Sequence, residues 1–232
     1  MKRIVLPGLE LMFHVKHDLP TLLAVAGGRR PSLIWLQEAA AARPLYCADK
    51  GCVYALEAQL KPKAVFGDGD SGGLEAFQRA QALGAQIFTF PVAKDATDLQ
   101  LLLEALPEGD VLLSGCWGGR FDHLFSLCFS LLGWKQQRKA LAIMADELEQ
   151  AVLLGPGERV DLRWQQLPQA VSLLPLTETA TVSLAGAQWP LNKQQLKMNY
   201  PYAISNRWLG KGPLSCTCHS GYVALYSCKS DL

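Results

Sequence analysis

Residues 21–132 alternate short apolar runs with segments whose apolar side chains recur at helical spacing. Most of these runs stop at glycine or at an acidic residue, as buried strands do where they enter a turn. The alternation predicts parallel β-α-β units, in which helices cover the faces of a sheet. The expected strands are residues 21–26, 44–48, 64–66, 86–90 and 111–114, and the expected helices begin near Ser32, Tyr54, Leu74, Thr97 and Phe121.

The pattern changes after about Asp146 to short segments with a two-residue alternation. We expect residues 151–154 and 159–164 to form a β-hairpin, and a helical turn near residues 192–196. The further strand candidates are residues 170–174, 180–184, 202–205, 214–219 and 222–227. The predicted fold is therefore an N-terminal parallel-sheet α/β domain, residues 21–146, followed by an all-β sandwich domain, residues 147–232. Residues 1–20 are expected to be an N-terminal extension.

Composition and charge exclude several classes of protein. With 22 basic and 21 acidic side chains the formal net charge is +1, so no global field would attract nucleic acid. No uninterrupted run approaches the roughly 18 apolar residues of a membrane-spanning helix, and no cleavage signal follows the N-terminus. Seven scattered cysteines do not form a disulfide framework, so we expect a reducing, cytoplasmic setting. Together with the charge and the absence of a spanning run, this leads us to expect neither a nucleic-acid nor a membrane partner.

Acidic side chains follow the predicted strands, where ligands bind to parallel sheets. In Gly67-Asp68-Gly69-Asp70-Ser71, carboxylates two residues apart share a face of an extended chain and can point into one site. Oxygen ligands of this kind suit Mg²⁺, and the glycines leave room for phosphate near the backbone. A solvated surface turn explains the same five residues equally simply.

Two further motifs can likewise be interpreted either as local structure or as part of a binding site. Residues 94–98, Lys-Asp-Ala-Thr-Asp, either open a helix with Thr97 or Asp98 as its N-cap, or bring a cation and phosphate to that terminus. Residues 118–123 place Arg120, which can clamp phosphate, beside Asp122, which can hold a metal or accept a proton. The alternative is a capped helix with a surface arginine, and His123 is expected to orient or pack rather than to bind metal.

Other candidates are weaker on their residues alone. Gly27-Gly28-Arg29-Arg30 lacks a full nucleotide-binding signature and is expected at the periphery of any phosphate site. Cys216 and Cys218 share a face of a predicted strand and are expected to be buried thiols rather than metal ligands. Trp189 either packs in the core or offers a flat surface for stacking a ring.

Taken in order, these motifs resemble those of the thiamine pyrophosphokinase family. Its members carry Ala-Asp-Gly-Gly, Gly-Asp-Phe-Asp-Ser, Lys-Asp-x-Thr-Asp and Gly-Gly-Arg-x-Asp-His, then Gly-x-x-Trp-x-Leu and a late Ser-Asn in a β-rich domain. The corresponding segments here are residues 48–51, 67–71, 94–98, 118–123, 186–191 and 205–206. The resemblance covers residues 21–227.

The resemblance implies transfer of diphosphate from ATP to the hydroxyl of thiamine, with release of AMP, in a homodimer whose active sites lie between subunits. It implies that Mg²⁺ is held by Asp68, Asp70 and Asp98. The catalytic residues would be Asp70, Asp98, Arg120 and Asp122. Those lining the path of ATP and its diphosphate would be Asp49, Asp68, Ser71, Asp95, Thr97, Gly119 and His123. Trp189 would stack on the thiamine ring, and Ser205 and Asn206 would hydrogen-bond its pyrimidine.

Two positions depart from the family pattern. Lys50 replaces the first glycine after Ala-Asp, and Gly69 replaces phenylalanine, while every expected acidic residue is present. These departures leave two alternatives open: a Mg²⁺-dependent diphosphotransferase acting on another hydroxylated heterocycle, and a non-catalytic protein that binds thiamine or a nucleotide.

Overall fold

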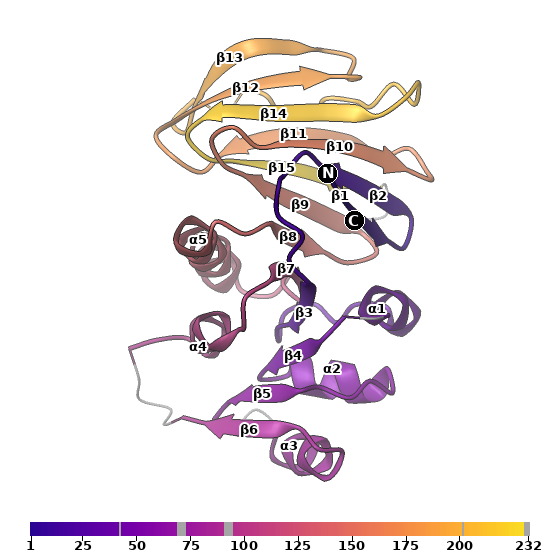
Figure 1. The fold of residues 1–232 in the computed structure, drawn as a ribbon, viewed down its shortest axis with the longest axis vertical. Coiled ribbons are helices and arrows are strands. Elements are labelled where there is room, and N and C mark those ends of the chain that lie inside the picture. Colours follow the sequence, from indigo (N-terminus) through magenta and orange to yellow (C-terminus); the bar gives the residue numbers. More distant parts are fainter. Residues whose placement is uncertain (42, 69–72, 91–94, 201, 230–232) are drawn as a thin grey trace. The chain divides into compact units, whose positions relative to one another are not determined.

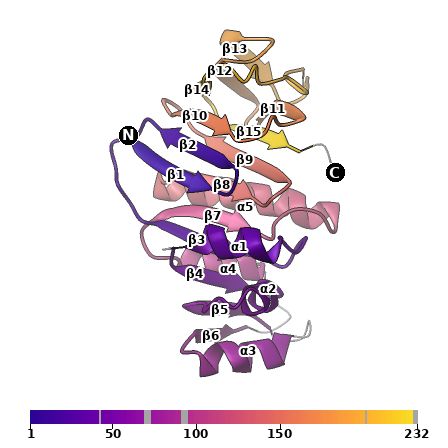
Figure 2. The same ribbon diagram turned by 90° about the vertical axis from the view of Figure 1, so that its right-hand side faces the viewer.

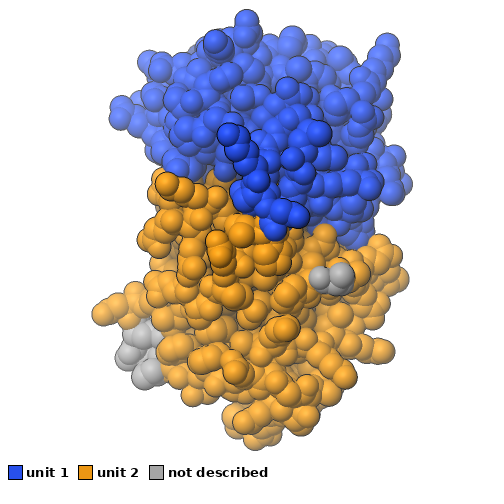
Figure 3. Space-filling model, viewed as in Figure 1, with its two compact units in different colours: residues 1–18, 148–232 blue, residues 19–147 orange. Residues whose placement is uncertain are grey.

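The computed structural model describes residues 1–41, 43–68, 73–90, 95–200 and 202–229. They form two compact units, one made of residues 19–147 and the other of residues 1–18 together with residues 148–232 (Figure 3). The first is an α/β unit with parallel strands and the second is built from antiparallel strands, which confirms the predicted fold class.

The α/β unit is a helix-covered parallel sheet. Its strands are β3 (Thr21–Val25), β4 (Leu45–Ala48), β5 (Ala64–Gly67), β6 (Gln86–Thr89), β7 (Asp110–Ser114) and β8 (Ala142–Ala145). Its helices are α1 (Leu33–Ala40), α2 (Gly51–Glu57), α3 (Gly73–Ala82), α4 (Asp98–Ala105) and α5 (Phe121–Arg138). Within the unit the strand order is β8-β7-β3-β4-β5-β6, and every neighbouring pair is parallel.

The order of the strands decides which face each helix covers. Successive strands β3 to β6 are added in one direction, and the chain then returns to place β7 and β8 on the other side of β3. Because crossovers between parallel strands are right-handed, this reversal sends the later helices to the opposite face. Figure 1 shows α1, α2 and α3 on one face and α4 and α5 on the other, and Figure 2 looks onto the face that carries α1 and α2.

The antiparallel unit contains two sheets. Its strands are β1 (Lys2–Leu6), β2 (Leu9–Phe13), β9 (Glu149–Leu154), β10 (Arg159–Trp164), β11 (Ala170–Pro175), β12 (Thr179–Ala185), β13 (Leu191–Lys197), β14 (Leu214–Ser220) and β15 (Val223–Cys228). Six pair in the order β1-β2-β10-β14-β12-β13, and three in the order β11-β15-β9. Alternate side chains of β10, β12 and β14 are buried, as expected of strands with one face toward a core. Cys216 and Cys218 of β14 are among these buried residues, which confirms them as core thiols.

Residues 1–18, expected to be an extension, belong to the antiparallel unit. Strands β1 and β2 form a hairpin around Pro7-Gly8, and β2 pairs with β10 so that Leu11 faces Leu162 and Phe13 faces Val160. Leu11 and Phe13 are completely buried. The alternation of apolar residues on both sides of a Pro-Gly turn was the sequence signal for this hairpin.

Three local predictions in the antiparallel unit are wrong. Strands β9 and β10 do not pair with each other, since β9 pairs with β15 and β10 with β2 and β14, so the turn between them connects two sheets. Residues 191–197 form strand β13 rather than a helical turn. Residues 202–205 form no strand, and Asn206 makes an isolated antiparallel bridge to Val171. Alternating polarity identifies a strand but not its partner, and β13 buries only Leu196, so it lacks that alternation.

Of the helices in the described ranges, none is both long and apolar enough to cross a membrane.

Replacing Leu11 by alanine is expected to lower the free energy of unfolding by about 2–5 kcal/mol, because it leaves a cavity in a packed core. The matched control is Val5→Ala on β1, whose side chain is 52% exposed and should cost less than about 1 kcal/mol. Urea unfolding measures both variants. Equal unfolding midpoints for Leu11→Ala and the unmodified protein would show that the N-terminal hairpin is dispensable for this unit.

Candidate active site

The turns that follow β3 and β7 are joined where the strand order reverses, the position at which parallel sheets bind ligands. The Gly28 N–H donates to the carbonyl of Gly115 at 2.7 Å, and the Arg29 N–H donates to the carbonyl of Trp117 at 2.6 Å. A Cβ on Gly28 would lie 2.8 Å from each of these two carbonyl oxygens. Glycine is therefore required at position 28 for the two turns to approach this closely.

Asp49 lies at the carboxyl end of β4 in a left-handed backbone conformation, with φ of +49°. Its N–H donates to the carbonyl of Phe66 at 2.9 Å, which ties it to the neighbouring strand β5. A Cβ on Gly67 would lie 2.6 Å from the Asp49 Oδ1 atom, so the absence of a side chain at position 67 makes room for this carboxylate. Asp49 and Gly67 thus place one carboxylate where strands β4 and β5 end together.

The structure describes two of the three predicted metal ligands, Asp68 and Asp98. Asp68 follows β5 directly and is half-buried, whereas Asp70 and Ser71 lie outside the described residues. Asp95 is described and exposed, and Asp98 is the first residue of α4. In the described part of the chain no three His, Cys, Asp or Glu side chains gather as a metal site would require. The predicted trio includes Asp70, which falls in the segment that is not described.

Thr97 is the N-cap of α4. Its hydroxyl accepts from the Gln100 N–H at 3.2 Å, and the Gln100 side-chain oxygen accepts from the Thr97 N–H at 2.8 Å. This reciprocal capping box confirms the helix-capping interpretation of Thr97. It also fixes the first turn of the helix, on which Asp98 is carried.

Arg120 and Asp122 form an exposed ion pair at the start of α5. The Arg120 Nε donates to Asp122 Oδ1 at 3.1 Å, and Nη2 donates to Oδ2 at 2.6 Å. This hydrogen-bonded guanidinium holds the pKa of the Asp122 carboxyl below its usual range. Gly118 and Gly119 precede the pair with positive φ angles of 66° and 73°, and His123 is exposed rather than packed in the core.

Sequence reasoning missed a second ion pair near this edge. Arg29 Nε and Nη2 donate to Asp146 Oδ2 at 3.1 and 2.7 Å, and the Asp146 side chain is completely buried. Asp146 follows the apolar strand β8 just as Asp68 follows β5, so the same signal, an acid directly after a buried strand, would have found it. The ion pair orients Arg29 beside Gly118, where an added Cβ would lie 3.2 Å from the Arg29 Cβ.

Lys50, the departure from the family pattern, is exposed at the N-cap of α2. Its Cβ would lie 3.2 Å from a Cβ placed on Gly27, so the residue borders the turn that follows β3. Gly69, the second departure, lies outside the described residues.

The three predicted thiamine-contacting residues lie close together in the antiparallel unit. Trp189 is 55% exposed, which excludes the interpretation that its ring packs in the core. Asn206 is buried, and its amide hydrogen-bonds both backbone groups of Trp189. Ser205 is exposed with φ of +59°, and its N–H donates to the Ser172 hydroxyl at 3.1 Å. An exposed indole and an exposed hydroxyl are therefore presented by backbone that is hydrogen-bonded in place.

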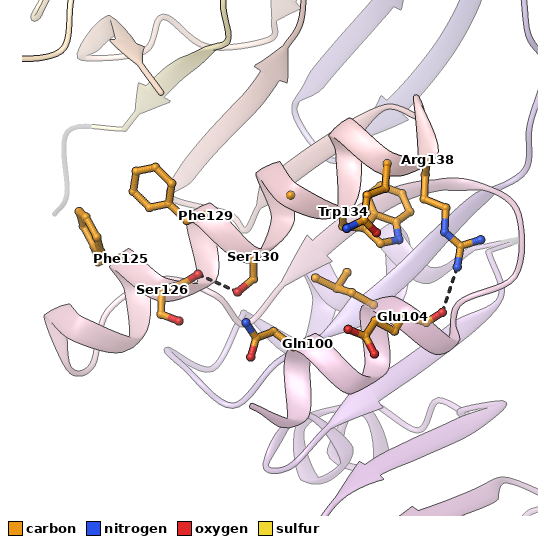
Figure 4. Close-up of a pocket in the computed structure, with 11 residues that line it drawn as sticks. Gln100, Glu104, Phe125, Ser126, Phe129, Ser130, Trp134 and Arg138 are labelled. Atoms are coloured by element: carbon orange, nitrogen blue, oxygen red, sulfur yellow. Dashed lines mark hydrogen bonds between the residues drawn. The ribbon is translucent and has the colours of Figure 1, made fainter. Parts of the chain in front are cut away.

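A groove of about 630 Å³ lies between α4 and α5 (Figure 4). Phe125 and Phe129 form its aromatic side, with ring centroids 4.8 Å apart, and Arg138 donates to the carbonyl of Glu104 at its other end. Its lining residues are Gln100, Leu103, Glu104, Phe125, Ser126, Phe129, Ser130, Gly133, Trp134, Gln137 and Arg138. None of these is a predicted site residue, and Gln100 connects the groove to one of them through its hydrogen bonds with Thr97.

Replacing Arg120 by glutamine is expected to raise the pKa of the Asp122 carboxyl toward its ordinary value of about 3.9, because the guanidinium favours the charged form. In the unmodified protein Asp122 should therefore stay ionised to lower pH than in the variant. Carboxyl ¹³C NMR titration measures both midpoints. Arg30→Gln, which removes an exposed partner of Glu57, is the control and should leave Asp122 unchanged. An identical Asp122 midpoint in Arg120→Gln would contradict the pairing.

Comparison with known proteins identifies two domains of one family along the chain. Residues 36–144 match the model "Thiamin pyrophosphokinase, catalytic domain", and residues 160–223 match "Thiamin pyrophosphokinase, vitamin B1 binding domain". The thiamine pyrophosphokinase of Bacillus subtilis (strain 168) is 29% identical over 163 residues, which are 68% of this chain and 75% of that protein.

Solved structures of similar proteins have the same fold. The crystal structure of the Bacillus subtilis thiamine pyrophosphokinase superposes with a TM-score of 0.77 at 24% identity, over 91% of this chain and all of that chain. A thiamin pyrophosphokinase family protein from Enterococcus faecalis gives 0.76 at 25% identity, over 91% and 100% of the two chains. The Candida albicans enzyme gives 0.71 at 14% identity, over 93% and 95%. With both domain models matched in order, the chain belongs to the thiamine pyrophosphokinase family.

Proposed function

We propose that this protein is a thiamine diphosphokinase, which transfers the terminal diphosphate of ATP to the hydroxyl of thiamine and releases AMP. The observation that carries the proposal is the match of both family domain models, the catalytic one to the α/β unit and the vitamin B1-binding one to the antiparallel unit. The proposal includes a reducing, cytoplasmic setting. In its support, all seven cysteines lie in the described ranges and are thiols.

The α/β unit would bind ATP and its phosphates at the carboxyl edge of the sheet. Carboxylate oxygens of Asp68, Asp70 and Asp98 are the ligands that suit Mg²⁺. Gly67, the residue before Asp68, leaves space for the carboxylate of Asp49. When bound, Mg²⁺ would neutralise charge on the phosphate oxygens. The donor chemistry of these residues therefore fits the metal that the family resemblance implies.

Arg120 would bind the transferred diphosphate. A guanidinium presents parallel N–H donors that match two phosphate oxygens, as it now matches both oxygens of Asp122. Phosphoryl transfer depends mainly on in-line positioning and charge stabilisation, so an exposed arginine beside Gly119 is suited to the task. When the Arg120 donors turn from Asp122 to phosphate, the Asp122 carboxylate would be available to accept a hydrogen bond from the substrate hydroxyl.

The antiparallel unit would bind thiamine on the exposed face of Trp189, with Ser205 offering a hydroxyl close by in the same unit. Indole is the aromatic side chain that binds a cationic ring most strongly, and the thiazolium ring of thiamine is cationic. The ring stands free enough to stack on a flat ligand because more than half of its surface is accessible.

Release of AMP should require ATP, Mg²⁺ and thiamine together, and Asp98→Asn should lower the rate by about 10²-fold or more, because it removes a charged oxygen ligand. The matched control is Glu104→Gln on the same helix, outside the predicted site, which should keep the rate of the unmodified protein. AMP release without thiamine, or full activity in Asp98→Asn, would contradict the proposal. Release only with a different hydroxylated heterocycle would indicate another acceptor, and thiamine binding without turnover would indicate a binding protein.

We further propose that the active protein is a homodimer in which the α/β unit of one subunit works with the antiparallel unit of the other. Support comes from large apolar side chains that the antiparallel unit exposes in residues 189–209, since exposed apolar surface marks interaction sites. They include Trp189, Tyr200, Tyr202, Ile204 and Leu209, which are 46–71% exposed.

Mixing two impaired variants tests this arrangement. At a thiamine concentration near the KM of the unmodified protein, Asp98→Asn and Trp189→Ala should each show little activity alone, Trp189→Ala because its thiamine KM is raised. An equal mixture that has exchanged subunits should regain about a quarter of the unmodified activity. That fraction follows because half of the dimers are mixed and each mixed dimer has one intact site. Exchange is verified with differently tagged subunits. Verified exchange without recovery would show that each site is built from a single subunit.

A further inference from the structure

The buried side-chain amide of Asn206 hydrogen-bonds the backbone of the segment that contains Trp189. Its Oδ1 accepts from the Trp189 N–H at 3.1 Å and from the Arg207 N–H at 2.8 Å, while its Nδ2 donates to the Trp189 carbonyl at 2.7 Å. The two N–H donors fix which end of the amide is oxygen, and the carbonyl fixes which end is nitrogen. The side chain thus imitates one rung of an antiparallel strand pair opposite Trp189.

Asn206 is itself held from the other side. Its own N–H and carbonyl exchange two hydrogen bonds of 2.8 Å with Val171, a fully buried residue of β11. The neighbouring residues continue the pairing: the Gln188 N–H donates to the carbonyl of Arg207 at 2.8 Å, and the Leu209 N–H donates to that of Gly186 at 3.1 Å. Asn206 therefore connects the core of the antiparallel unit to the loop that carries Trp189.

The ring of Trp189 has no comparable support of its own. More than half of the side chain is exposed, so packing of the ring cannot define where the backbone of residue 189 lies. Pro190 follows, and it has no N–H with which to tie the next peptide. The two hydrogen bonds from the Asn206 amide hold both polar groups of the backbone that carries the indole.

We infer that Asn206 is a positioning residue for thiamine, acting through Trp189 rather than by direct contact with the pyrimidine. The inference rests on the proposed function, because it takes Trp189 as the surface on which thiamine stacks. Only an amide of this length offers a donor and an acceptor to the two backbone groups at once, so aspartate, which has the same shape, keeps the acceptor and loses the donor.

The first test is a double-mutant cycle on thiamine-dependent AMP release. Asn206→Asp should raise the KM for thiamine about tenfold, because a buried carbonyl loses its donor, and should leave the KM for ATP unchanged. In a Trp189→Ala background the same substitution should change the thiamine KM less than about twofold, since its effect passes through the missing ring. Asn199→Asp, an exposed asparagine in the same unit, is the matched control for the added charge. Additive effects of the two substitutions would overturn the inference in favour of direct contact.

The second test does not depend on activity. Backbone hydrogen exchange at Trp189 should be at least about tenfold faster in Asn206→Ala than in the unmodified protein, because the amide oxygen that protects this N–H is removed. Exchange at Val171, on the far side of Asn206, reports whether the unit is still folded. Unchanged exchange at Trp189 would refute the positioning role. A protein that shows this exchange effect but releases no AMP with thiamine would instead refute the proposed function alone.

Discussion

Strand β3 is paired in parallel on both sides, and the candidate site depends on that pairing. Leu23 lies opposite Leu45 of β4 and Leu112 of β7, and all the strands of the α/β unit end at one edge. The pairing continues into the turns, where the Ala26 N–H donates to the carbonyl of Ser114 at 2.8 Å and the Gly28 N–H to that of Gly115. Segments far apart in the sequence therefore deliver their polar side chains to the same edge because the register of buried strands brings them there.

Five strands of the α/β unit, β3 to β7, could be predicted from the sequence because they are short and bounded by glycine or acids, whereas β8 was not among the expected strands. Asp49 and Asp68 were placed correctly at strand ends for that reason. The antiparallel unit could be predicted less well. The alternation in β10 identifies a strand but cannot say that it pairs with β2 and β14 rather than with β9. Strand β13 is polar apart from Leu191 and Leu196, so hydrophobic periodicity carries no signal for it.

The site contains contacts that local sequence patterns did not pair. The Arg29–Asp146 ion pair joins residues 117 positions apart, and neither the Gly27–Arg30 turn nor an acid after β8 indicates by itself that the two side chains meet. Trp189 could equally have been a core residue until its exposure was known. The family resemblance suggested Asn206 as a direct thiamine ligand, and the structure adds that its amide hydrogen-bonds the backbone of Trp189. Motifs thus indicate which residues matter, while hydrogen bonds show how each one contributes.

The central claim is that the chain transfers a diphosphate as a single group, and ³¹P NMR of the products tests it most directly. Incubation of the purified protein with ATP, Mg²⁺ and thiamine should yield AMP and thiamine diphosphate, whose two coupled phosphorus resonances arise together with that of AMP. Formation of ADP and thiamine monophosphate would show transfer of one phosphoryl group and would contradict the account. So would the absence of any phosphorylated thiamine from a folded protein.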